Sequence, residues 1–299
     1  MKKNKGLIPV LMTPFNKNGS IDFIGLKNLI EFLDKKKIGG YWVLGTGGED
    51  MNLSFSQRMD VFEAVYEINQ DRKPIFIGAS FNEFSNTVSF IKQLNRYKIK
   101  GGVHYMIYNS LSGEKSIYNS YKRLADISTN SLWIYTSANW GKYLEPKVIS
   151  DLKEYPNITG VKFSTSNTND MNKVANLSDD SFTVFSAVIS TFYSCLCNGV
   201  DGSTSSLGSS IPEAILEIYD NYQKKNYKKA LTLQRKLNQF LSLMNTSAQK
   251  NNFLKSAEEK TILEIRGICK RHVSFPFIDC KKSEKKYLQE LINKFYPKF

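Results

Sequence analysis

Short apolar runs alternate along the chain with longer stretches in which apolar residues recur every three or four positions. Eight runs are apolar or β-branched enough to be strands, and they span residues 7–11, 41–44, 74–79, 102–106, 131–136, 158–163, 182–186 and 199–204. The helical spacing is seen at Leu26, Leu29 and Leu33, after the cap residues Ser20 and Asp22. This alternation predicts repeated βα units around a parallel sheet, an α/β protein with a (β/α)8 (TIM) barrel.

Beyond residue 211 the strand pattern stops and only helical spacing continues. The helical stretches span residues 212–222, 227–244, 257–268 and 284–295. We therefore expect a barrel catalytic domain over residues 1–210, with its last helix running to about residue 225, and a C-terminal helical extension over residues 226–299. The length of 299 residues is compatible with one barrel domain carrying a small extension.

Composition and charge exclude several classes of protein. A hydrophobic fraction of 41% and a charged fraction of 23% are typical of a folded globular chain. The formal net charge of +13 raises nucleic acid as a partner, but the lysines occur in short scattered groups typical of solvated helix ends. We expect no nucleic-acid partner, and the basic field is compatible with small anionic keto acids.

Targeting signals and metal-binding patterns are also missing from the sequence. It has no uninterrupted apolar stretch of about 18 residues, and Met1–Lys5 leads into a strand without a signal-peptide core. The four cysteines form no Cys-x-x-Cys pair, and only His104 and His272 are available beside them. The sequence predicts a cytoplasmic protein without membrane association, disulfide, metal or other cofactor.

Lys162 is the first candidate for chemistry, because active sites of such barrels lie at the carboxyl ends of the strands. It lies in the apolar run Ile-Thr-Gly-Val-Lys-Phe-Ser at residues 158–164. One interpretation is a strand-end lysine whose ammonium reaches solvent. The other is an amine whose pKa burial depresses, so that it attacks a ketone as the neutral nucleophile. Its position within the strand favours the second interpretation.

Two further elements have polar groups at strand ends. The second strand is followed by Gly-Thr-Gly-Gly-Glu-Asp at residues 45–50, where successive backbone amides can hold a carboxylate or phosphate. A tight βα turn, or a helix cap by Glu49 or Asp50, explains the same residues. Tyr135 lies in the fifth strand and is either a core residue or a proton shuttle one strand away from Lys162.

In this order the motifs resemble the dihydrodipicolinate synthase / N-acetylneuraminate lyase family of pyruvate-dependent class I aldolases. The opening segment, residues 6–15, reads Gly-Leu-Ile-Pro-Val-Leu-Met-Thr-Pro-Phe and is similar to the family's G-x-x-x-x-x-x-T-P-F. The family's G-[TS]-T-G-E turn falls on residues 45–49, and its G-x-K strand falls on residues 160–162. The resemblance spans nearly the whole chain, including the helical tail.

The resemblance implies a role for each site residue. Lys162 forms the imine with pyruvate or another 2-keto acid, and Tyr135 relays protons. Thr46 links that tyrosine to solvent, and Tyr108 completes the relay across a subunit interface. The substrate side is implied to comprise the amides of Thr46 and Gly47 for the carboxylate, with the carbonyl of Thr204 beside the reacting centre. No metal or cofactor is needed, and a homodimer or homotetramer is implied.

Three departures from the family pattern bear on the substrate. Gly47 stands where most relatives carry a second hydroxyl. Trp140 stands where the synthase has an arginine for its acceptor's carboxylate, and an indole cannot replace a bidentate fork. The acidic pair of the sialic acid lyase is missing from residues 186–190. The polar residues that bind acceptor hydroxyls instead, or form plain solvated turns, are Ser164, Thr165, Ser166, Ser203, Ser205 and Ser206.

We therefore expect an aldolase that forms or cleaves a 2-keto-3-deoxy sugar acid from pyruvate and an aldehyde. Dihydrodipicolinate synthase itself is the enzymatic alternative, and Trp140 argues against it. A catalytically retired barrel that binds a keto acid is the alternative from another class. The retention of Lys162, Tyr135, Thr46 and Tyr108 together argues against that one.

Overall fold

The computed structural model describes residues 4–108, 113–137, 139–252 and 254–297. The chain divides into two compact units. The first comprises residues 1–8, 39–42 and 71–204, and the second comprises residues 9–38, 43–70 and 205–299.

The first unit is built on a sheet of eight parallel strands. The strands are β1 (Gly6–Leu7), β2 (Tyr41–Val43), β3 (Ile75–Gly78), β4 (Gly102–Tyr105), β5 (Leu132–Ser137), β6 (Ile158–Ser164), β7 (Thr183–Ser186) and β8 (Gly202–Ser203). Their order in the sheet is β1-β8-β7-β6-β5-β4-β3-β2. The amide of Gly39, just before β2, donates to the carbonyl of Leu7 in β1 over 2.8 Å. The two ends of the sheet are therefore linked, and the predicted (β/α)8 barrel fold is confirmed.

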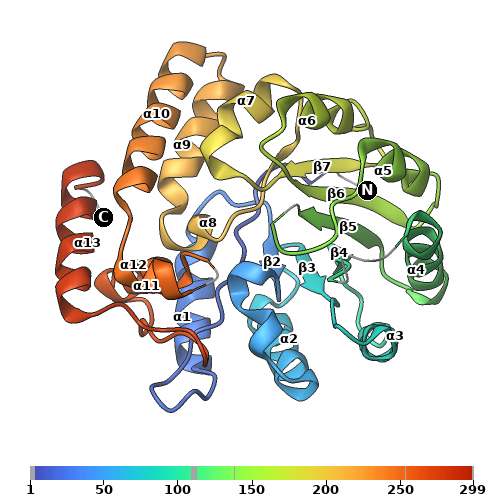
Figure 1. The fold of residues 1–299 in the computed structure, drawn as a ribbon, viewed down its shortest axis with the longest axis horizontal. Coiled ribbons are helices and arrows are strands. Elements are labelled where there is room, and N and C mark those ends of the chain that lie inside the picture. Colours follow the sequence, from blue (N-terminus) through green and yellow to red (C-terminus); the bar gives the residue numbers. More distant parts are fainter. Residues whose placement is uncertain (1–3, 109–112, 138, 253, 298–299) are drawn as a thin grey trace. The chain divides into compact units, whose positions relative to one another are not determined.

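Helices of the first unit lie on the outer side of this sheet. They are α3 (Phe84–Leu94), α4 (Glu114–Ile127), α5 (Pro146–Lys153), α6 (Thr168–Ala175) and α7 (Phe192–Cys197), with the 3-10 turn η3 (Ile189–Thr191) before the last. Figure 1 shows α4, α5 and α6 outside strands β4 to β7. Aromatic rings fill the inner side, where Trp133 stacks on Phe185 with centroids 5.4 Å apart. The inner face is thus closed by large side chains and not by solvent.

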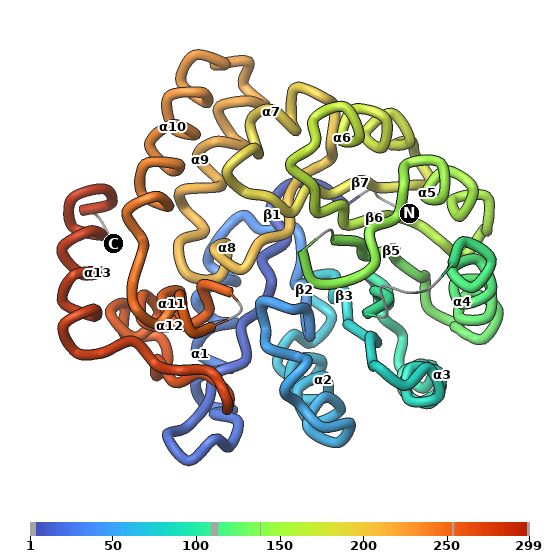
Figure 2. Tube along the Cα trace, viewed as in Figure 1, coloured from blue at the N-terminus to red at the C-terminus, as the bar shows by residue number. Residues whose placement is uncertain are grey.

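The second unit is helical. It contains α1 (Phe23–Asp34), η1 (Thr46–Gly48), η2 (Asp50–Asn52), α2 (Phe55–Asn69), α8 (Leu207–Ser210), α9 (Pro212–Gln223), α10 (Tyr227–Leu243), α11 (Ser247–Asn251), α12 (Ser256–Ile265) and α13 (Lys282–Phe295). Asp22 caps α1 as predicted, because its carboxylate accepts from the Gly25 amide over 3.0 Å. Helices α9 and α10 run side by side in Figure 2 and pack on each other.

Strand and helix bounds differ from the predictions in a few places. Strands β1 and β8 are shorter than the apolar runs that predicted them, because the pairing beyond them continues only as isolated bonds. One of these runs from the Ile8 amide to the Ser203 carbonyl over 2.9 Å. The four long helices predicted after residue 211 are confirmed as α9, α10, α12 and α13. The predicted domain boundary near residues 210–225 stays a prediction. In the described ranges, no helix has the length and apolarity needed to cross a bilayer.

Candidate active site

Lys162 lies in the middle of the sheet with an aromatic residue beside it. In the strand register Tyr135 of β5 is its partner on one side and Phe185 of β7 on the other. The lysine is only 4% exposed. Its Nζ lies 4.2 Å from the centre of the Tyr135 ring and 5.0 Å from that of Trp42. This burial does not fit a lysine whose ammonium reaches solvent.

Steric crowding explains why a glycine, Gly160, lies two residues before Lys162. Residues 160, 162 and 164 share one face of β6 because side chains alternate along a strand. A Cβ added at Gly160 would lie 2.5 Å from the Trp133 ring, which is closer than real Cβ atoms approach. The glycine at position 160 therefore leaves room for the Trp133 ring on this face of β6.

Tyr135 is held by the loop that follows its own strand. The indole Nε1 of Trp140 donates to the Tyr135 hydroxyl over 2.8 Å. Two hydrogen bonds bring the chain after Trp140 back to β5. Thr136 Oγ1 donates to the Lys142 carbonyl over 3.0 Å and accepts from the Leu144 amide over 2.8 Å. Trp140 stands at the position of the synthase's acceptor-binding arginine, so we expect it at the substrate as well, and that contact stays a prediction.

Trp42 and His104 are site residues that sequence reasoning missed. Trp42 in β2 is fully buried and stacks on the His104 ring of β4, with centroids 4.0 Å apart. Both rings lie edge-on to Tyr135, with centroids 5.9 Å away in each case. An aromatic residue in an apolar strand is usually core, so the sequence held no signal that separated these two from the other buried rings.

A cavity of about 440 Å³ opens at the carboxyl ends of β5, β6 and β7. Its lining is Asn139, Tyr143, Ser164, Thr165, Ser166, Asn167, Asp170 and Val188. Among the described residues, none that lines it is a lysine or an arginine. Tyr143 donates to the Asp170 carboxylate over 2.7 Å, and burial together with this bond raises its pKa well above the usual range. The cavity is thus a set of hydroxyls and amides with a single carboxylate.

Thr204 is fully buried, whereas Tyr108 is only half-buried. The Thr204 amide donates to the Ser186 carbonyl over 2.9 Å. Its hydroxyl is fully buried and has no hydrogen-bond partner in the part of the chain that the structure describes. Tyr108 is half-buried beyond the end of β4. The relay role of Tyr108 stays a prediction.

The glycine-rich turn belongs to the second unit and has a compact form. Thr46, Gly47 and Gly48 form the 3-10 turn η1, closed by bonds from the Gly48 amide to the Gly45 carbonyl and from the Glu49 amide to the Thr46 carbonyl, over 2.7 and 3.1 Å. A Cβ at Gly47 would lie 2.7 Å from Cβ of Ser206. The side chain of Ser206 therefore takes the space that a hydroxyl residue at position 47 would need.

Glu49 ties this turn to the C-terminal helices. Its backbone is left-handed, with φ of 61°. One carboxylate oxygen pairs with Lys260 Nζ of α12 at 2.5 Å, and the other accepts from the amide and hydroxyl of Ser274, both at 2.6 Å. The carboxylate therefore does not cap a helix, which was one reading of this residue. The sequence did not predict the ion pair of Lys260, because this lysine lies in a helix with an ordinary amphipathic pattern.

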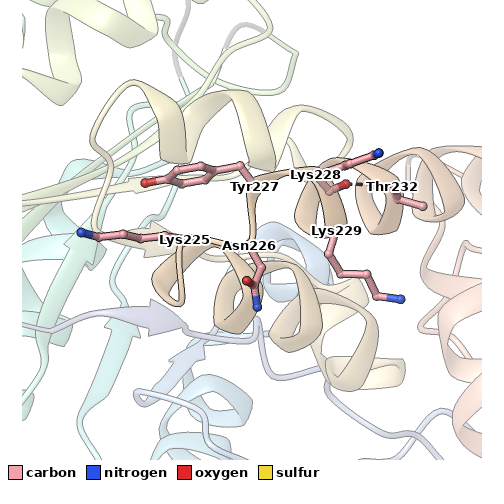
Figure 3. A pocket seen from close by; sticks show the side chains of 6 residues that line it. All are labelled: Lys225, Asn226, Tyr227, Lys228, Lys229 and Thr232. Atoms are coloured by element: carbon pink, nitrogen blue, oxygen red, sulfur yellow. Dashed lines mark hydrogen bonds between the residues drawn. The ribbon is translucent and has the colours of Figure 1, made fainter.

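A second cavity, of about 580 Å³, lies at the start of α10 in the second unit. Figure 3 shows Lys225 extending away from Lys228 and Lys229, so the three ammonium groups do not converge on one point. Tyr227 beside them is 47% exposed. This surface offers charge but no built site. Nor do the described residues bring three or more histidine, cysteine or acidic side chains together in a way that would hold a metal ion.

Comparison with known proteins agrees across the whole chain. A sequence model described as the dihydrodipicolinate synthetase family matches residues 3–295. The 4-hydroxy-tetrahydrodipicolinate synthase of Karelsulcia muelleri is 26% identical over 291 residues, which cover 96% of each chain.

Solved structures give the same result for the fold. Dihydrodipicolinate synthase from Bacteroides thetaiotaomicron superposes with a TM-score of 0.90 at 23% identity, covering 98% of this chain and 99% of the other. A sialic acid aldolase of Ruminococcus gnavus, solved as a catalytic lysine mutant, gives a TM-score of 0.90 at 19% identity, with both chains fully covered. A structure named as a dihydrodipicolinate synthase and one named as a sialic acid aldolase are therefore equally similar to this chain in fold.

Proposed function

This chain belongs to the dihydrodipicolinate synthetase family, and from that premise we propose that it forms or cleaves a 2-keto-3-deoxy sugar acid from pyruvate and a polyhydroxy aldehyde. Members of the family are class I aldolases that hold pyruvate as a Schiff base, and the chain is a carbon–carbon lyase of this type. The acceptor and the residue roles are the parts that we propose.

Lys162 is the nucleophile in this proposal. Its neutral amine attacks the keto carbon of pyruvate, the resulting carbinolamine loses water, and a protonated imine remains. Loss of a proton from the methyl carbon then gives an enamine, whose carbon attacks the aldehyde. Hydrolysis of the product imine releases the keto acid and restores the amine. Cleavage runs through the same intermediates in reverse.

Tyr135 moves the protons in these steps. Water can leave the carbinolamine only if its hydroxyl gains a proton, and we assign that proton to the phenol of Tyr135, the strand neighbour of Lys162. The Trp140 bond supports this role, because an indole N–H that donates to the phenol oxygen leaves the phenol its own proton to give. We assign Thr46 and Tyr108 to the same relay on the family resemblance alone.

The pyruvate carboxylate is assigned to the amides of Thr46 and Gly47. Backbone amides of a tight turn suit an anion, and a glycine at position 47 keeps its amide while it lacks a hydroxyl. Thr204 is assigned to the reacting centre, where the resemblance gives a role to its carbonyl. Its buried hydroxyl adds a second polar atom at this position.

The cavity at the ends of β5 to β7 carries the acceptor proposal. Ser164 shares the strand face of Lys162 and lines this cavity. The lining supplies hydroxyl, amide and carboxylate groups, which match the donors and acceptors of sugar hydroxyls. An acceptor that bears a carboxylate would meet Asp170 there, at a cost from like charges.

Dihydrodipicolinate synthesis is the second candidate, favoured by the names of the relatives at about a quarter identity, such as the enzyme of Karelsulcia muelleri. It uses aspartate semialdehyde, which carries a carboxylate. We also propose a homo-oligomer, because the assigned role of Tyr108 requires a second subunit.

The first test is trapping of the imine. The protein is incubated with pyruvate and borohydride, and intact mass and peptide mapping follow. One reduced pyruvyl group on Lys162, absent from Lys162→Ala, is the expected result. No adduct, or an adduct on another lysine, would refute the proposed nucleophile and favour a retired keto-acid-binding barrel.

The second test concerns the acceptor. Aldose-type aldehydes and aspartate semialdehyde are compared as partners of pyruvate, with wild type and Asp170→Asn. We expect turnover with the aldoses, and a KM for the aldehyde raised about tenfold in the variant, with the KM for pyruvate unchanged. Asp151→Asn, an exposed aspartate of α5 that pairs with Lys147, is the matched control. Preference for aspartate semialdehyde would establish the second candidate instead.

A further inference from the structure

The nitrogen of Lys162 lies in a corner made by two aromatic rings. Nζ is 4.2 Å from the centre of the Tyr135 ring and 5.0 Å from that of Trp42. The two rings stand nearly perpendicular to each other, at 86°. Both distances lie within the range in which a cation is attracted by the electron-rich face of a ring, and tryptophan has the strongest face.

Trp42 is fixed in this position from several sides. It is fully buried and stacks on His104 at 4.0 Å and on Phe76 at 5.7 Å. The edge of Trp133 closes a third side, with centroids 6.3 Å apart. Because dense packing holds the indole, its face is in place before any substrate binds.

We propose that Trp42 is a catalytic residue, whose indole face holds the positive charge that the Lys162 nitrogen carries in the protonated imine. The proposal rests on the function proposed above, in which Lys162 forms that imine. An aromatic face suits the task because it stabilises a cation without a full negative charge, which would repel the carboxylate of pyruvate.

The chemistry gives this contact a distinct pH signature. Attack on pyruvate requires the neutral amine, whereas cyanoborohydride reduces only the protonated imine, so the rate of trapping rises and then falls with pH. A ring face favours the cationic form of the nitrogen in both species. Loss of the face should therefore move both limbs of the profile to lower pH. A merely structural role for Trp42 would lower the rate without moving either limb.

The experiment measures initial rates of trapping with pyruvate and cyanoborohydride, from about pH 5 to about pH 10. For Trp42→Leu we expect both limbs to move down by about one pH unit, as cation–π energies predict. Trp42→Phe, which keeps a weaker face, should move them by less. Trp133→Phe is the matched control, because it alters another buried indole of the same cluster and should leave both limbs in place.

Among the described residues, Tyr135 and His104 are titratable groups that face this nitrogen or the ring beside it. Tyr135 approaches from β5, and His104 of β4 lies behind Trp42, whereas β7 contributes Phe185. His104→Phe keeps a stacked ring and removes the imidazole. The rising and falling limbs of its pH–rate profile should match those of the wild type. Limbs that move in the His104 variant but not in the Trp42 variants would overturn the proposal.

A graded variant keeps the test decisive if Trp42→Leu does not fold. Fluorinated tryptophans introduced at position 42 through an amber codon retain the shape of the indole and weaken its face stepwise. The limbs should shift further with each added fluorine, and limbs that stay fixed would refute the proposal. If the wild type gives no Lys162 adduct, the proposed function fails as well. A normal wild-type adduct with immobile limbs refutes only the role of Trp42.

Discussion

Two buried lysines lie in the two units of the molecule and meet different surroundings. Lys162 in the first unit has its nitrogen over the rings of Tyr135 and Trp42. Lys260 in the second is fully buried, lies 4.3 Å from the centre of the Phe15 ring and pairs with Glu49 at 2.5 Å. Burial lowers the pKa of Lys260, and the Glu49 charge opposes that change.

The contrast shows that the group facing a buried lysine decides whether its charge can change. An ion pair stabilises the charged lysine by a full opposite charge, so giving up the proton would leave Glu49 buried and unpaired. Aromatic faces carry no net charge, so a lysine against them can alternate between amine, iminium and ammonium. The ion pair of Lys260 holds the glycine-rich turn. The aromatic surroundings of Lys162 suit the imine chemistry that we propose for it.

Replacing Lys162 should give the largest effect, a loss of activity without a loss of stability. We expect Lys162→Met to lower kcat by at least about a thousandfold, because no imine can form. Its free energy of unfolding should equal or exceed that of the wild type, since a buried amine is replaced by an apolar chain. Steady-state kinetics and urea unfolding measure the two quantities, and an active variant would break the comparison.

Lys260→Met should show the opposite behaviour. Removing one partner of a buried pair costs about 3–5 kcal/mol of unfolding free energy, because Glu49 keeps its charge without its partner. Urea unfolding tests this, and adding Glu49→Gln to the same chain should restore part of the loss. A change below about 1 kcal/mol in the single variant, as for exposed pairs, would contradict the assignment.

Glu259, next to Lys260 on α12, gives a pH-dependent test. Burial raises its pKa to about 8, Glu258 adds to the rise, and Ser206 and Lys255 oppose it. Since the folded pKa exceeds the unfolded one, the stability that depends on the protonated acid is complete below about pH 4.5 and is lost as pH rises towards about 8.

Glu259→Gln removes this penalty. The variant should match the wild type below about pH 4.5 and exceed it by about 4–5 kcal/mol above about pH 8, measured by thermal or urea unfolding across pH. A difference that does not grow with pH would show that the acid is already ionised in the fold.

Trp140→Phe should have the smallest effect. The variant loses the bond from Nε1 to the Tyr135 hydroxyl, so we expect kcat to fall about fivefold with the KM for pyruvate nearly unchanged. Trp133→Phe loses a comparable bond, from Nε1 to the Gly101 carbonyl, and serves as the control. If both variants lost the same fraction of kcat, the loss in Trp140→Phe would come from altered packing and not from the lost bond to Tyr135.

The sequence predicted those features that depend on periodicity and on spacing within a strand. The strand order and the pairing of Tyr135 with Lys162 follow from the βα alternation. Trp42 and Lys260 could not be predicted in the same way. Trp42 meets Lys162, and Lys260 meets Glu49, across more than 100 residues of sequence. Nothing in a strand tryptophan or a helix lysine marks which buried group it will meet.

Trp140 illustrates a third case, in which the residue was singled out but its contact was not. Its indole was noticed because it replaces an arginine in the family pattern. The bond to Tyr135 depends on the return of the loop that Thr136 fixes, and loop geometry is not encoded in hydrophobic periodicity.

The contact between Gly47 and Ser206 constrains how this sequence can change over generations. Restoring threonine at position 47 alone would drive its Cβ into Ser206, with atoms 2.7 Å apart. Changing Ser206 to glycine first would open space that nothing fills. Each single step is therefore disfavoured, so a lineage that has acquired this pair is expected to keep it.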